Sequence, residues 1–360
     1  MRYTFFLCIG LLLMTIQASS QGCVAIRSIG GMCMMEHTGA DTTESKWMFN
    51  ANNRYFKSFR HFVGTQEQPQ RVANGTEVIN HSYALDLTLT RILNKRWSLA
   101  FNMPILYNER SSLYEHGGKE RHTTKSFGMG DVRFTAYAWI LDPASHHRFN
   151  AQAGLGIKLP TGDYKYQDKF YTATPGVTVY GPVDQSIQLG DGGTGFTTEL
   201  NAYYNLSHRV NLYGNFYYLI NPREQNGVST ARGGTPSPTA VAYGSDVMSV
   251  PDQYMYRLGA NFQVNRFTLS GGIRKECVPA KDLVGGSNGF RRPGYVVSVE
   301  PGVTYAFKKM SLYAYVPVAV KRDRTQSVPD MIKTDITGTY AQGDAAFADY
   351  SVSIGMNIRF

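Results

Sequence analysis

Residues 347–360 alternate apolar and polar side chains up to a carboxy-terminal aromatic residue. The apolar members of this stretch are Tyr350, Val352, Ile354, Met356, Ile358 and Phe360. Alternation with a period of two places them on one face of a β-strand and the polar residues on the other. An unbroken apolar face on a last strand is typical of a membrane barrel, where lipid contacts one face and the lumen the other. The pattern predicts the closing strand of such a barrel.

The same alternation recurs along the chain in pairs of segments joined by short polar turns. The expected pairs are 83–89 with 97–107, 132–140 with 149–157, 196–204 with 210–220, 256–262 with 267–273, and 295–305 with 312–320. Long polar stretches separate the pairs, near 65–82, 109–127, 159–192, 221–252, 278–293 and 322–346. Outer-membrane barrels have short periplasmic turns and long extracellular loops, whereas a soluble β-sandwich has no reason to sort its loops by length. We therefore predict an all-β fold, a transmembrane antiparallel up-and-down β-barrel of about 12 strands over residues 47–360, in the cell outer membrane.

The amino terminus predicts export. Met1-Arg2-Tyr3, an apolar segment over 5–16 and Ala18-Ser19-Ser20 have the form of a signal peptide over residues 1–20. A lipoprotein signal, with Cys23 as the acylated residue, stays open as an alternative. Residues 21–46 show no clear period and are expected to be an N-terminal periplasmic segment or a lumenal plug. In an oxidising compartment Cys23 and Cys33 can form a disulfide.

Composition narrows the class of protein further. The chain has 360 residues with 24 Tyr and 36 Gly, and after the amino terminus no run of about 18 apolar residues, which excludes helical membrane spans. The formal charge of +9 could suggest nucleic acid, but no segment combines a basic stripe with interleaved aromatic residues. We expect the basic residues of turns and outer loops to meet lipopolysaccharide, so the predicted partners are outer-membrane lipid and lipopolysaccharide, with no nucleic acid.

The sequence offers no catalytic or metal-binding motif. No Cys/His cluster has the spacing of a zinc site, so no metal and no cofactor is expected. The stretch Gly190-Asp191-Gly192-Gly193-Thr194-Gly195 matches a dinucleotide-binding fingerprint by letters, but a strand follows it where a helix is needed. No Ser/His/Asp set has a supporting motif, and we predict that the protein is not an enzyme.

The polar side chains, which alternate with apolar ones along each strand, are expected to line the barrel interior. The charged ones among them are Asp86, Asp131, Arg133, Lys158, Glu199, Arg257, Arg274, Glu276, Glu300, Lys321, Asp349 and Arg359. Acids and bases are equal in number, which argues against a strongly ion-selective pore. Two interpretations stay open: these groups form salt bridges that hold the barrel together, or they line a solute path with Tyr137, Trp139, Tyr203, Tyr213, Tyr217, Tyr313 and Tyr315. Aromatic walls suit small apolar or aromatic solutes.

Two short motifs, Gly128-Met-Gly-Asp131 and Gly156-Ile-Lys-Leu-Pro160-Thr-Gly162-Asp163, stand among repeated Gly/aromatic strands. Over roughly residues 127–360 the chain resembles the outer-membrane transporter family named for the meta-pathway of phenol degradation, whose architecture is related to the FadL fatty-acid channels. The resemblance implies a passive channel for uptake or export of small hydrophobic or aromatic solutes in a Gram-negative envelope. It supplies no catalytic residues, and the amino-terminal hatch motif of the FadL proteins is absent.

Three further expectations remain open. The alternative function is a closed structural or accessory outer-membrane barrel without transport activity. The last strand, ending at Phe360, resembles the signal read by the barrel-assembly machinery. The stretch from Cys277 to Gly294 either folds inward as a constriction or forms an ordinary turn-rich loop.

Overall fold

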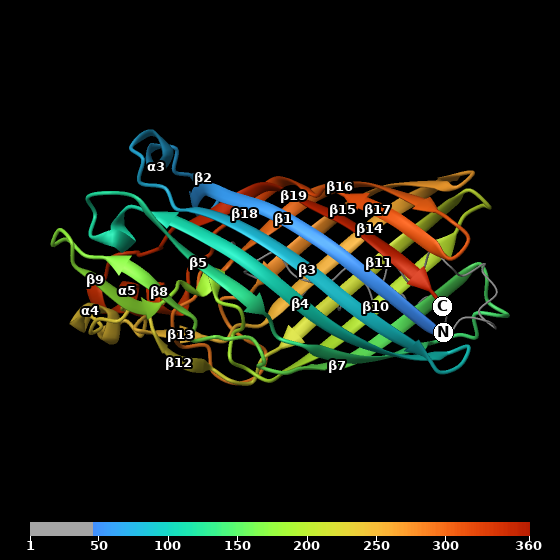
Figure 1. The fold of residues 1–360 in the computed structure, drawn as a ribbon, viewed down its shortest axis with the longest axis horizontal. Helices are drawn as coiled ribbons and strands as arrows, with labels where there is room; N and C mark the ends of the chain where they lie inside the picture. The colour runs from blue at the N-terminus through green and yellow to red at the C-terminus, as the bar shows by residue number, and fades with distance from the viewer. Residues whose placement is uncertain (1–45) are drawn as a thin grey trace.

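The computed structural model describes residues 46–360. Most of these residues belong to one closed β-sheet that curls into a cylinder, with both ends of the described chain at the same rim, and two small two-stranded sheets lie in the loops (Figure 1). The expectations for the signal peptide over 1–20, for the segment 21–46 up to residue 45, and for a Cys23–Cys33 disulfide lie outside the described residues.

The wall consists of twelve antiparallel strands, two of which are interrupted and carry two labels each. In wall order they are β1 (Trp47–Val63), β3 (Ile79–Ile92), β4 (Trp97–Ser112), β5 (His122–Met129) with β6 (Arg133–Trp139), β7 (Phe149–Lys158), β10 (Gly195–Asn205), β11 (Val210–Ile220), β14 (Gln253–Val264), β15 (Phe267–Val278), β16 (Gly294–Ala306), β17 (Met310–Tyr315) with β18 (Val318–Asp323), and β19 (Ala345–Arg359). Strand β19 pairs with β1, and Trp47 and Phe360 exchange backbone hydrogen bonds of 2.9 and 3.0 Å. The last strand therefore closes the barrel, as its pattern predicts.

The remaining elements gather at the rim opposite the termini (Figure 1). They are β2 (Gln66–Glu67), α3 (Gln70–Ala73), η1 (Tyr114–His116), β8 (Gln167–Tyr171), β9 (Thr178–Pro182), η2 (Gln185–Ile187), β12 (Gln225–Ser229), α4 (Pro238–Ala242), β13 (Val247–Ser249) and α5 (Val328–Thr337). Within residues 46–360 we find no helix that could serve as a membrane span. The long loops thus share one rim and the short turns the other, which is the expected division between extracellular and periplasmic sides.

The outward-facing side chains of the strands are apolar and exposed. Leu155, Leu258 and Ile273 are 69%, 68% and 60% exposed, which is unfavourable in water and requires a lipid surround. Aromatic side chains mark both edges of this band: Trp47, Trp97, Phe149, Phe267 and Phe360 at the periplasmic rim, and Tyr55, Tyr83, Tyr107, Tyr295 and Tyr350 towards the outer rim. Such girdles lie at the two membrane interfaces. The predicted outer-membrane barrel is confirmed.

The expected loop over 109–127 is wrong at both of its ends. Strand β4 runs to Ser112 and β5 begins at His122, and these two residues are paired. Beyond the lipid band both faces of a strand meet polar surroundings, so the ladder continues after the period-two signal has ended.

The expected lumenal position of Lys321 is also wrong. Lys321 pairs with Val297 and Ala319 pairs with Ser298, so β18 carries one extra residue at this point. This β-bulge changes the facing of the following side chains. Lys321 lies exposed on the outer wall and Arg322 is buried inside.

Candidate functional site: the lumen and its outer mouth

The two motifs of the sequence form one structural unit at the interruption between β5 and β6. Gly130, Asp131 and Val132 leave the ladder, and the Asp131 carboxylate accepts hydrogen bonds from the backbone N–H groups of Gly162 and Asp191, at 3.0 and 3.2 Å. Thr161 donates its hydroxyl to the Gly130 carbonyl at 3.0 Å and accepts from the Val132 N–H at 2.9 Å. The motifs therefore anchor the start of the β7–β10 loop to the interrupted strand, and with it the position of that loop at the mouth.

Four inner tyrosines lie along the wall because each is paired directly across strands with a glycine. The pairs are Tyr137 with Gly154, Tyr213 with Gly259, Tyr315 with Gly302 and Tyr313 with Gly355. A Cβ on Gly154 would approach the Tyr137 ring to 2.6 Å, and the other three glycines are crowded in the same way. The rings therefore lie against the wall, in the space that a side chain at the glycine position would take.

Glu300 binds two arginines on the inner wall. It pairs with Arg257, and its second oxygen lies 3.3 Å from Arg274, which also binds Glu276 at 2.8 Å. The Arg257 guanidinium stands 5.8 Å from the centroid of the Tyr213 ring and 5.7 Å from that of Tyr315. We call Arg257, Arg274, Glu276 and Glu300 the Glu300 cluster; it joins β14, β15 and β16.

A second group lies on the neighbouring strands of the wall, from β4 to β11. Arg133 donates to the Tyr217 hydroxyl at 3.1 Å and to the Asn102 side chain at 3.0 Å. The Tyr137 hydroxyl donates to Glu199 at 3.0 Å. Hydroxyl groups, one arginine and one carboxylate thus face the same part of the lumen, a combination that can bind the polar substituent of an aromatic solute.

The other predicted lumenal residues are distributed over the height of the barrel. Towards the periplasmic side the rings of Trp139 and Tyr203 meet edge to face, with centroids 6.0 Å apart. Lys158 pairs with Asp191 and lies 3.6 Å from Asp131. Asp86 is buried, and its Oδ1 has no hydrogen-bond partner among the described residues. Asp349 binds Arg60 at 2.8 Å and Arg322 at 2.6 Å near the outer rim.

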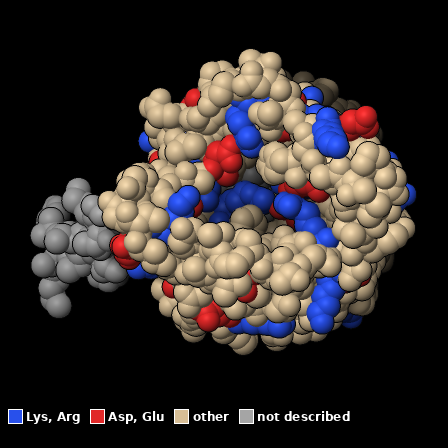
Figure 2. Space-filling view, turned by 90° about the vertical axis from the view of Figure 1, so that its left-hand side faces the viewer, with Lys and Arg blue, Asp and Glu red and all other residues tan. Residues whose placement is uncertain are grey.

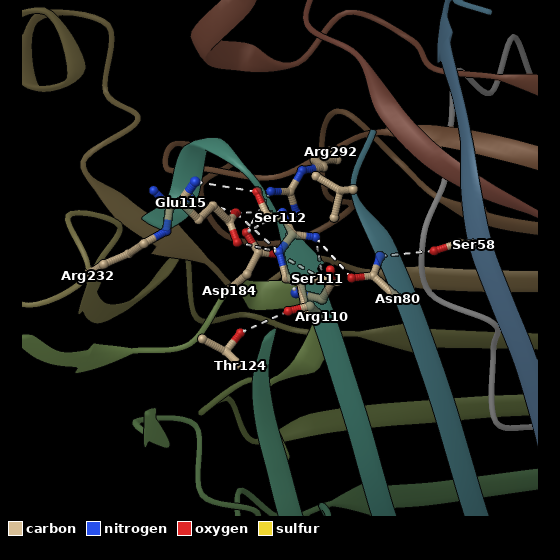
Figure 3. A network of polar contacts seen from close by, with 12 residues as sticks. Ser58, Asn80, Arg110, Ser111, Ser112, Glu115, Thr124, Asp184, Arg232 and Arg292 are labelled. Atoms are coloured by element: carbon tan, nitrogen blue, oxygen red, sulfur yellow. Dashed lines mark hydrogen bonds and ion pairs between the residues drawn. The ribbon is translucent and has the colours of Figure 1, made fainter. Parts of the chain in front are cut away.

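Five residues that the sequence did not single out form a network across the mouth (Figure 3). Asp184, in the β7–β10 loop, accepts two hydrogen bonds from Arg292, at 2.8 and 2.6 Å, and lies 3.5 Å from Arg110 on β4. Glu115 binds Arg110 at 2.7 Å and Arg232 at 2.8 Å. We call Arg110, Glu115, Asp184, Arg232 and Arg292 the mouth network.

The mouth network joins opposite sides of the barrel. Arg110 comes from the third strand of the wall, whereas Arg292 comes from the loop between the ninth and tenth. The β15–β16 loop is itself anchored by a bidentate ion pair, in which Arg291 donates to Asp282 at 2.7 and 2.6 Å with both side chains fully buried. Of the two expectations for the stretch from Cys277 to Gly294, this anchoring favours the loop that folds inward and not the ordinary turn-rich loop.

The mouth nevertheless stays hollow. Seen from the outer end, the space-filling surface has a central depression with Lys and Arg on its walls and fewer Asp and Glu (Figure 2). Among residues 46–360, no group of His, Cys, Asp and Glu could hold a metal ion. The mouth is thus a depression whose walls carry more basic than acidic side chains.

The carboxylates of the mouth network are held in their charged form. Burial alone raises the pKa of Asp184, but Arg110 and Arg292 outweigh it and keep this pKa well below the ordinary 3.8. Burial likewise raises the pKa of Glu115, and Arg110 reverses the direction, so the pKa is lowered from 4.5. A carboxylate with a lowered pKa stabilises the folded arrangement above its ordinary pKa and loses that contribution as the pH falls through the lowered value.

We therefore expect the conductance of the barrel in planar bilayers to be constant between about pH 5 and pH 8. An increase is expected only in strong acid, where Asp184 takes up a proton and releases the arginines. The matched control is Asp184→Asn, which has no proton to gain at this position and should lack the acid transition. A rise in wild-type conductance already near pH 6 would contradict this assignment.

The charged residues of the mouth carried no recognisable signal in the sequence. Arg110 and Glu115 fall in a stretch without period, and Asp184 and Arg292 are 108 positions apart. Pairing over such a distance depends on how the loops fold.

Comparison with known proteins places this geometry among outer-membrane barrels. Residues 63–335 match the family described as MetA-pathway of phenol degradation. An outer membrane channel from Pseudomonas putida F1 is similar in structure, with a TM-score of 0.55 and 11% identity over 89% of this chain and 100% of that one. The translocator domain of an autotransporter from Neisseria meningitidis has a TM-score of 0.46 and 11% identity over 89% and 91% of the two chains. A toluene transporter from Pseudomonas putida has a TM-score of 0.45 and 7% identity over 95% and 96%.

Proposed function

Because the chain belongs to the family described as MetA-pathway of phenol degradation, a family of outer-membrane transporters, we propose that it lets small aromatic and other hydrophobic solutes diffuse passively across the outer membrane. The direction follows the concentration gradient, so uptake and export use the same path. The solute passes the mouth network, then the Arg133 group and the Glu300 cluster, and leaves along the tyrosine-covered wall.

The observation that carries the proposal is the hollow inside the ring of inward-folded loops (Figure 2). It is supported by the inner tyrosines that lie against glycines of the neighbouring strand and so keep their rings at the wall. The charged groups along the path are mostly engaged with one another, as in the Glu300 cluster. A solute would therefore meet polar walls whose charges are largely neutralised, which favours small neutral molecules over ions.

The alternative, a closed structural barrel, has one specific observation in its favour. The mouth network ties opposite sides of the barrel together, and Arg110, Glu115 and Asp184 have side chains that are 4%, 1% and 5% exposed. A network so well enclosed could hold the mouth permanently shut.

Uptake of the aromatic dye N-phenyl-1-naphthylamine by intact Gram-negative cells separates the two functions, because lipopolysaccharide excludes the dye and its fluorescence reports arrival in the membrane. We expect cells that make this barrel to take up the dye several times faster than cells that make an unrelated closed barrel at the same level. Purified protein in liposomes should admit little sugar. Heat-dependent migration on a detergent gel verifies that the barrel is folded. If dye uptake by cells with folded barrel is unchanged, the channel proposal is wrong and the closed barrel is favoured.

Two partners belong to the same proposal. The barrel-assembly machinery would read the strand that ends at Phe360 before that strand pairs with β1, since in the folded barrel its backbone groups are already bonded to Trp47. Lipopolysaccharide would surround the outer half of the apolar band.

A further inference from the structure

The outer wall carries a pair of lysines that converge on one aromatic ring. Lys275 on β15 and Lys321 on β18 flank β16, and both are paired with the same residue, Val297. The Lys275 ammonium lies 4.6 Å from the centroid of the Tyr295 ring, and the Lys321 ammonium lies 5.4 Å from the same centroid. Two positive charges thus share one ring, an arrangement in which they repel each other.

These three residues face the membrane. On β15, Lys275 points to the same side as Ile273, and on β16, Tyr295 points to the same side as Val299. Ile273 and Val299 are 60% and 47% exposed, so this side is the outer one. Lys321 reaches the same surface because of the β-bulge in β18. Tyr295 pairs with Cys277 on β15 and with Asp323 on β18. It therefore lies two residues nearer to the outer loops than Val297, with which both lysines pair. Both lysines therefore extend from the edge of the apolar band towards the outer interface, as long cationic side chains do at a membrane surface.

No carboxylate neutralises the pair. Tyr295 is the main polar partner of Lys321, and Asp323 adds a weaker electrostatic attraction, but within the described part of the chain neither lysine forms an ion pair. Charges on the lipid face of a barrel are unfavourable unless the interface supplies a counter-ion. At the outer interface that counter-ion is a phosphate group of the lipid, whose oxygens can accept hydrogen bonds from two ammonium groups at once.

We propose that Lys275, Tyr295 and Lys321 form a binding site for a lipid phosphate of the outer leaflet, the phosphate groups of lipid A in lipopolysaccharide. The phosphate sits between the two ammonium groups, and the Tyr295 ring, which both ammonium groups contact, holds them close together. The site fixes one lipid at the β15–β16–β18 sector of the barrel; it rests on the lipopolysaccharide contact proposed above and is separate from the lumen.

Native mass spectrometry of the detergent-purified barrel titrated with lipid A tests the site. We expect the double variant Lys275→Ala with Lys321→Ala to weaken binding by about fivefold for each lysine removed. The charge-conserving pair Lys275→Arg with Lys321→Arg should retain binding. The matched control is Lys308→Ala with Lys309→Ala, which removes the same charge from the exposed turn at the periplasmic rim and should leave lipid A affinity unchanged.

Two ligand controls identify the source of the phosphate. Lipid A without its phosphates should bind wild-type and double-variant protein equally weakly, and inorganic phosphate at millimolar concentration should not displace lipid A. Equal loss of affinity in the two alanine pairs would overturn the site, as would unchanged affinity in the Lys275/Lys321 variant. Displacement by inorganic phosphate would overturn its assignment to lipid. Heat-dependent gel migration verifies that each variant is folded.

Discussion

Replacing Glu300 by Gln is expected to lower the free energy of unfolding by about 3 kcal/mol, because it removes the carboxylate from between two buried arginines. Glu300 and Arg257 are 1% and 3% exposed. A neutral amide cannot balance the Arg257 guanidinium, and the cost of burying this charge remains after its partner is gone. Denaturant unfolding in detergent, followed by intrinsic fluorescence, measures the change.

Glu67→Gln is the matched control for Glu300→Gln. Glu67 binds Arg60 at 2.5 Å, but their side chains are 36% and 32% exposed, so water screens the pair. Its loss is expected to cost at most about 1 kcal/mol. Equal effects of the two substitutions would mean that water in the lumen screens the Glu300 cluster as well as bulk water screens the rim.

The second large effect is expected at the mouth. Asp184→Asn should raise single-channel conductance or dye uptake at least about tenfold, because charge-assisted hydrogen bonds contribute about 1.5–3 kcal/mol and this substitution weakens those from both Arg110 and Arg292. The β7–β10 and β15–β16 loops then separate, and the mouth widens. The barrel wall does not depend on Asp184, so folding should be unaffected.

Asp163→Asn provides the control in the same loop. The Asp163 carboxylate accepts a hydrogen bond of 2.9 Å from the nearby Lys165 N–H and is exposed. The substitution changes the same charge without touching the mouth network, and conductance should stay at the wild-type level. If both variants conduct alike, the mouth network does not restrict the path.

The wall of the barrel could be predicted from the sequence, whereas its mouth could not. Lipid imposes a period of two on each strand, so Leu155 or Ile273 reveals the facing of its whole segment. That constraint ends at the interface, which is why the outer parts of β4 and β5 went unrecognised. A single inserted residue, as at Lys321, reverses the facing without any compositional trace.

Individual charges could be assigned to the interior, but not their partners. The parity of Arg257 and Glu300 follows from the pattern, while their contact depends on the register between β14, β15 and β16. The mouth network is harder still, because Asp184 and Arg292 meet only after two long loops have folded. The role of the inner residues in a solute path stays a prediction.

The tyrosines that rest on glycines have a consequence for how the calibre of such a barrel can change. Tyr315 keeps to the wall only while position 302 lacks a side chain. A methyl group at this position would collide with the Tyr315 ring and push it away from the wall, towards the barrel axis. A single glycine substitution would thus narrow the space inside the barrel and leave strand number, register and every charge unchanged.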